Sequence, residues 1–133
     1  MRFPFFQERP EVAQPQGLIE ALLNSEAPFG DRHDAAMDLG MYDEAEAEAA
    51  LLAVACDTAT ARMLAEECEG SLVEIWARRR EFNASALSGL SGETLLRACK
   101  LIAARMPEWR EHVESVLRGG ATPPNNSFNP TRK

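Results

Sequence analysis

The sequence predicts a single all-α domain, and three observations support that prediction. Alanine, leucine, glutamate and arginine dominate residues 16–118, where the β-branched residues that favour strands are scarce. Apolar residues recur there at intervals of three and four, which is the period of a helix with one buried face. The 133 residues suffice for one compact core and are too few for two ordinary domains.

Residues 61–80 have the most regular apolar spacing in the chain and are expected to form the central helix. The apolar positions step by four, four and three, so they share one face. Three arginines close the segment, where the negative end of the helix dipole favours cations. The predicted buried face of this helix consists of Leu64, Cys68, Leu72, Ile75 and Trp76.

Three helices are expected before the central one. Three prolines forbid a long helix in residues 1–15, so an extended segment with a phenylalanine cluster is expected there. The helical spacing then predicts helices at residues 16–25, 31–42 and 43–57, with a loop at 26–30 that contains proline and glycine.

Two of these helices carry features with a simple structural explanation. In the second, Gly40 lies beside other small residues, and we interpret it as a site of close helix packing rather than a ligand site. The third opens with Asp43, Glu44, Glu46 and Glu48, which suit the positive end of the helix dipole. We interpret this acidic run as a solvated helix start.

Two further helices are expected after the central one. Residues 83–92 are rich in serine and glycine and predict a loop with one helical turn at 84–87. The next helix should run to Met106, and Pro107 should open the last one, where its missing amide costs nothing. Gly119 and Gly120 are expected to stop it. Residues 119–133 have the composition of a disordered tail.

Charge and composition bear on the class of partner. The chain has a net charge of −7 and a pI near 4.9. It should therefore repel nucleic acid, whose phosphate backbone is also negative. No apolar run is long enough for a signal peptide or a membrane span. The three cysteines lie within apolar helical patterns, which is typical of buried thiols in a reducing compartment. We therefore expect a soluble, cytoplasmic protein that does not bind membranes.

The sequence offers little support for catalysis, and we predict a protein that is not an enzyme and has no cofactor. His33 and His112 are far apart, and neither belongs to a short metal-ligand motif. A zinc site built from Cys56, Cys68 and a histidine would require long-range convergence, and buried thiols are the commoner arrangement. The sequence has no nucleophile elbow and no glycine loop for phosphate.

Residues 31–57, DRHDAAMDLGMYDEAEAEAALLAVACD, and residues 64–79, LAEECEGSLVEIWARR, resemble the small bacterial HEAT-repeat proteins. The likeness covers about residues 18–80. It implies a short right-handed α-solenoid of about three helical hairpins within residues 16–118. Such repeats serve mostly as binding scaffolds, and the fold alone does not fix a function. Separately, residues 124–131, PNNSFNPT, resemble the end of an integron gene cassette.

Two polar stripes at helical spacing are the candidate partner-binding residues. One comes from the predicted second helix and the other from the central helix, and in HEAT-like solenoids such helices line the concave face. Solvated helix faces are the default explanation for charged stripes of this kind. Glu74 and Arg78 are also spaced for an i,i+4 ion pair. The stripes comprise Asp34, Asp38, Tyr42, Glu67, Ser71, Glu74 and Arg78.

Two functions follow from this pattern. In the first, the chain is a non-enzymatic module whose acidic surface binds a partner protein, and a basic surface on that partner would suit it. In the second, a pocket between helices near Trp76 and Cys68 binds a small molecule or performs catalysis.

Overall fold

The computed structural model describes residues 14–119, and every regular element in that range is helical. The expected extended segment and the expected disordered tail fall almost wholly outside the described residues. The helices are α1 (Gln16–Leu23), α2 (Phe29–Leu39), α3 (Ala45–Cys56), α4 (Arg62–Arg79), α5 (Ala84–Ser88), α6 (Gly92–Arg105) and α7 (Arg110–Leu117), with a short 3-10 helix at Pro107–Trp109. The all-α prediction is confirmed.

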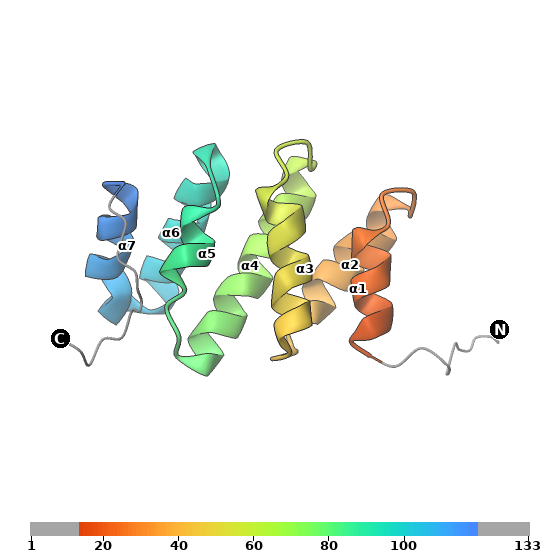
Figure 1. Ribbon diagram of the computed structural model, residues 1–133, viewed down its shortest axis with the longest axis horizontal. Coiled ribbons are helices and arrows are strands. Elements are labelled where there is room, and N and C mark those ends of the chain that lie inside the picture. Colours follow the sequence, from red (N-terminus) through yellow and green to blue (C-terminus); the bar gives the residue numbers. More distant parts are fainter. Residues whose placement is uncertain (1–13, 120–133) are drawn as a thin grey trace.

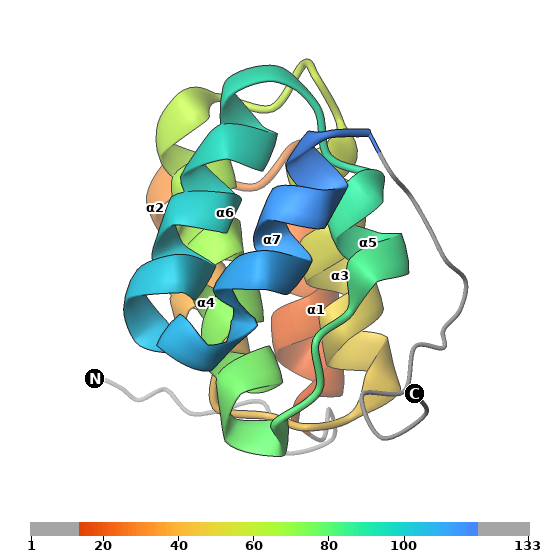
Figure 2. The same cartoon turned by 90° about the vertical axis from the view of Figure 1, so that its left-hand side faces the viewer.

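The helices form two rows (Figure 1). One row holds α1, α3 and α5, and the other holds α2, α4 and α6. Successive helices pair across the rows, α1 with α2, α3 with α4, and α5 with α6. The last helix, α7, packs against both α5 and α6 at one end of the molecule (Figure 2).

The centre of the molecule is α4, which contacts α2, α3 and α6. Its predicted face is confirmed, because Leu64, Cys68, Leu72, Ile75 and Trp76 are all buried. The apolar cluster continues from this face into α1, α3, α5 and α7. α4 ends at Arg79. The next residue, Arg80, has a left-handed φ of 55°, and the Glu81 amide donates a hydrogen bond back to the Trp76 carbonyl.

Several helix boundaries differ from the prediction. α2 begins at Phe29 rather than at residue 31, because Pro28 lies in extended backbone and its carbonyl accepts the Arg32 amide. Asp31 therefore lies in the first turn. The predicted helical turn at 84–87 is confirmed as α5, and the Asn83 side chain accepts a hydrogen bond from the Ala86 amide. In the last helix, Val113 and Val116 are buried, whereas Leu117 is 43% exposed.

One feature of α3 corrects the prediction more strongly. Glu48 was assigned to a solvated helix start, but it is buried and lies on the same face as Leu51 and Ala55, which are three and seven positions further on.

None of the described helices is long and apolar enough to cross a membrane.

Candidate interaction surface

Ser71 lies inside the helical packing and cannot contact a partner. It is 5% exposed, and its Oγ donates a 2.7 Å hydrogen bond to the carbonyl of Ala36 in α2. Gly40 lies against the same side chain, where an added Cβ would sit 2.8 Å from Ser71 Oγ. The assignment of Ser71 to the binding surface is therefore wrong, and Gly40 is indeed a site of close packing.

Arg78 and Tyr42 meet at the end of α2. Arg78 Nη1 donates to the Gly40 carbonyl at 3.0 Å, and Nη2 forms a 2.6 Å ion pair with Asp43. Arg78 thus satisfies a carbonyl that the end of the helix leaves open. Tyr42 is half-buried and packs against the apolar cluster. Arg78 therefore holds the end of α2 to α4, while Tyr42 packs against the core.

Glu67 and Glu74 each have a partner on a neighbouring helix. Glu67 Oε1 lies 3.3 Å from His33 Nε2 of α2, and Glu74 Oε2 lies 3.2 Å from Arg105 Nε of α6. The predicted pair between Glu74 and Arg78 does not form, because the two side chains turn toward opposite neighbours of α4. At this exposure such pairs contribute little to stability, about 0–1 kcal/mol each.

Asp34 and Asp38 differ from the other charged residues of the predicted set in having no described ion pair. Both are exposed on α2, and neither forms an ion pair with any residue in the described range. Met37 and Met41 lie beside them on the same helix and are 48% and 78% exposed. The exposed side of α2 therefore combines unpaired acids with apolar side chains.

The structure contains two buried glutamates, Glu69 and Glu48, whose contacts between helices were not predicted from the sequence. The first, Glu69 of α4, is 1% exposed and binds Arg97 of α6 through two hydrogen bonds, Nε to Oε1 at 3.0 Å and Nη2 to Oε2 at 2.9 Å. Burial raises the pKa of Glu69, and the hydrogen bond and charge of Arg97 oppose that rise. This pair ties α6 to α4.

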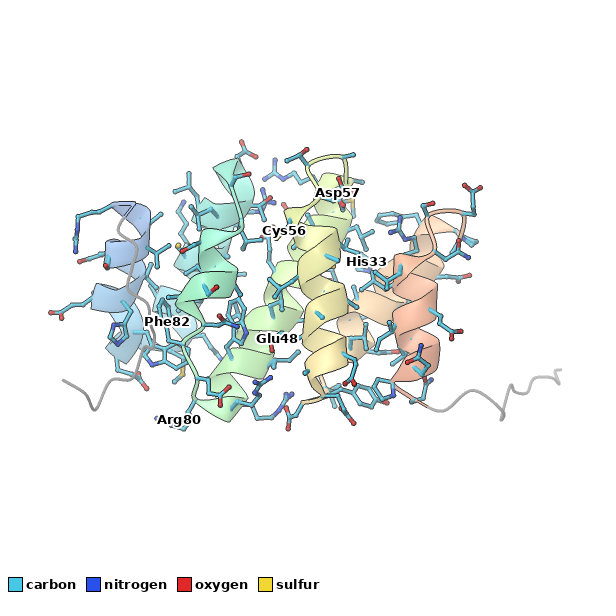
Figure 3. All side chains as sticks on the ribbon, in the orientation of Figure 1. His33, Glu48, Cys56, Asp57, Arg80 and Phe82 are labelled. Carbon is cyan, nitrogen blue, oxygen red and sulfur yellow. The ribbon has the colours of Figure 1, made fainter. Side chains whose placement is uncertain are left out.

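The second carboxylate is Glu48 (Figure 3). Its Oε2 accepts hydrogen bonds from Trp76 Nε1 at 2.7 Å and from Asn83 Nδ2 at 2.9 Å, and its Oε1 lies 3.2 Å from Arg79 Nη1. Asn83 in turn caps α5. The carboxylate therefore joins α3 and α4 to the start of α5, a structural role that accounts for its polar contacts.

The signal for both carboxylates is present in the sequence. Glu69 precedes Leu72 by three positions and Trp76 by seven, so it falls on the apolar face of α4. Glu48 has the same spacing to Leu51 and Ala55. A charged residue within an apolar helical stripe predicts a buried partner of opposite charge or a hydrogen-bond donor.

The residues proposed to line a pocket are tightly enclosed. Trp76 is 1% exposed and Cys68 is 0% exposed, whereas a cavity large enough for a ligand would leave accessible surface on its walls. Burial raises the pKa of Cys68 to about 12, so its thiol is a poor nucleophile at neutral pH. Within residues 14–119, no three histidine, cysteine or acidic side chains cluster in a way that could hold a metal ion.

Comparisons with protein-family models, with curated proteins and with solved structures found no match to this chain. The resemblance to HEAT-repeat proteins and to a gene-cassette end therefore stays a prediction.

Proposed function

We propose that the chain is a non-enzymatic interaction module, a short HEAT-like right-handed α-solenoid, whose acidic α2 surface binds a basic partner protein. The observation that carries this proposal is the pair Asp34 and Asp38, exposed and without an ion-pair partner among residues 14–119. Unpaired acids of this kind attract a partner of opposite charge and set the orientation of binding.

Two further observations support the proposal. The helix pairs α1 with α2, α3 with α4 and α5 with α6 follow one another in the way that stacked helical hairpins do. By contrast, Glu67, Glu74 and Arg78 already form ion pairs with other parts of the chain. The binding role thus narrows to Asp34 and Asp38, with Glu67 and Glu74 at its edge.

The test is a pull-down from cells that carry this protein, with the full chain as bait. The double variant Asp34→Lys/Asp38→Lys reverses the surface charge without touching a described ion pair. The matched control, Glu111→Lys/Glu114→Lys, makes the same change of charge on exposed positions of α7. We expect the first variant to lose partners that the control retains. Equal recovery by both variants and the unmodified chain would contradict the proposal.

A further inference from the structure

Three side-chain contacts fix how α2 lies against α4. His33 lies level with Glu67, Ser71 bonds to the Ala36 carbonyl, and Arg78 reaches Asp43. Position numbers rise together in both helices, so the two helices run parallel. The residue one turn after His33 is Met37, which therefore lies level with the turn of α4 that contains Gly70.

The same reasoning places α6 on the other side of α4. Arg97 binds Glu69, and Arg105 lies beside Glu74 two turns further on. Leu101 is midway between the two arginines and on the same face of α6. It is therefore level with the Gly70 turn as well, so Met37 and Leu101 stand on either side of that turn.

The space above Gly70 is open. A Cβ added there would meet no atom within 4 Å, in contrast to the one at Gly40, which would meet Ser71. Met37 is 48% exposed and Leu101 is 41% exposed. We call this open space, bounded by Met37 and Leu101, the Gly70 gap. Glycine weakens the middle of a helix, and no neighbouring side chain in the described structure requires Gly70 to be small.

Acidic groups outnumber basic ones around the gap. Asp34 and Asp38 lie on α2 without a described ion pair. Glu67 and Glu74, which precede and follow Gly70 on α4, are each paired with a neighbouring helix. On α6, Arg97 and Arg105 pair with acids of α4, and Lys100, next to Leu101, is exposed. An apolar gap with this surrounding charge complements an apolar side chain flanked by cations.

We propose that the Gly70 gap receives an apolar anchor from a basic amphipathic helix of the partner protein. A helix presents apolar residues at intervals of three and four, with lysine or arginine beside them, which matches an apolar gap with an acidic border. Methionine adapts its shape to an apolar partner, as Met37 would do here. This inference rests on the proposed function and specifies its partner.

Three labelled synthetic peptides of about 15 residues, four helical turns, test the inference by fluorescence anisotropy. The first carries leucine at helical spacing and lysine elsewhere, the second has the same leucines with glutamate, and the third has the same lysines with serine in place of leucine. With the full chain, the leucine–lysine peptide should bind at least tenfold more tightly than either of the others.

Filling the gap is the decisive change. Gly70→Gln should weaken binding of the leucine–lysine peptide tenfold or more, and the protein should still fold because the added side chain meets open space. The matched control is Ala53→Gln, an exposed small residue within α3, in the other row. This control should leave the affinity unchanged. Circular dichroism of both variants checks that the helical content is preserved.

Three results would overturn the inference. Equal binding of the serine–lysine peptide would show that charge alone acts, and unchanged binding to Gly70→Gln would place the peptide elsewhere. The native chain could also sediment as a dimer while Gly70→Gln sediments as a monomer. That result would assign the gap to a second copy of the chain. If Gly70→Gln has no effect while Asp34→Lys/Asp38→Lys abolishes binding, the inference fails and the proposed function stands. If neither variant has an effect, both fail.

Discussion

The Glu48 carboxylate accepts a 2.7 Å hydrogen bond from the indole Nε1 of Trp76, and both side chains are buried. Glu48→Ala would leave the indole, the Asn83 amide and the Arg79 guanidinium without this acceptor. We expect a loss of about 2–4 kcal/mol in the free energy of unfolding, measured in urea. A loss below about 0.5 kcal/mol, the range of surface substitutions, would contradict this structural role.

A double-mutant cycle isolates the Glu48–Trp76 contact. Trp76→Phe keeps most of the ring and removes the donor, so it should cost about 1–3 kcal/mol alone. Combined with Glu48→Ala, the total loss should be smaller than the two single losses together by about 1 kcal/mol or more. Strict additivity would mean that the two residues stabilise the fold independently.

Gly40 and Gly70 should respond oppositely to alanine. At Gly40 the new Cβ would lie 2.8 Å from Ser71 Oγ, so Gly40→Ala should cost about 1–3 kcal/mol through overpacking between α2 and α4. At Gly70 the space is open, and Gly70→Ala should stabilise the chain by about 0.5–1 kcal/mol through helix propensity. Thermal unfolding of the two variants checks the prediction. A destabilised Gly70→Ala would show that the gap is not open.

Glu69 should make stability depend on pH. Burial raises its folded pKa, so between the unfolded value, about 4.3, and the folded value the folded state binds more protons than the unfolded state. The contribution of Glu69 to the free energy of unfolding is therefore present below the unfolded pKa and is lost as pH rises through the folded pKa. The free energy of unfolding of the native chain, relative to Glu69→Gln, should fall across that window. If the stability of the native chain relative to Glu69→Gln rose with pH instead, the effect of Arg97 on the Glu69 pKa would outweigh that of burial.

The cysteines should differ in reactivity. Cys56 is exposed, whereas Cys68 and Cys99 are buried, and burial raises the pKa of Cys68 to about 12 and that of Cys99 to about 11. N-ethylmaleimide at neutral pH should therefore modify Cys56 in the folded chain and all three cysteines in urea. Peptide mass spectrometry identifies the sites. Rapid labelling of Cys68 in the folded chain would support a ligand-accessible space beside it.

The sequence predicts the helices well because their apolar spacing is local information. Residue type and helical period predict the buried face of α4, the short helix α5 and the close packing at Gly40. Helix ends were less accurate. The second helix was expected to begin at residue 31, but the extended conformation of Pro28 starts α2 two residues earlier.

The pairing of polar side chains between helices is the part that sequence spacing missed. Ser71 sits beside polar positions in the helical pattern, yet the close approach of α2 buries it against Ala36. Glu74 and Arg78 are well spaced for an i,i+4 pair, yet Arg105 and Asp43 come nearer in the folded chain. These outcomes depend on the register between helices, which residues far apart in sequence determine.

The most direct measurement of the proposed binding surface is an amide NMR titration of the ¹⁵N-labelled full chain with the leucine–lysine peptide. The proposal predicts that shift changes concentrate on the outer turns of α2, α4 and α6 around Asp34, Asp38, Gly70 and Leu101, and that α1, α3 and α7 change little. Changes concentrated on α1, α3 or α7, or none at saturating peptide, would contradict it.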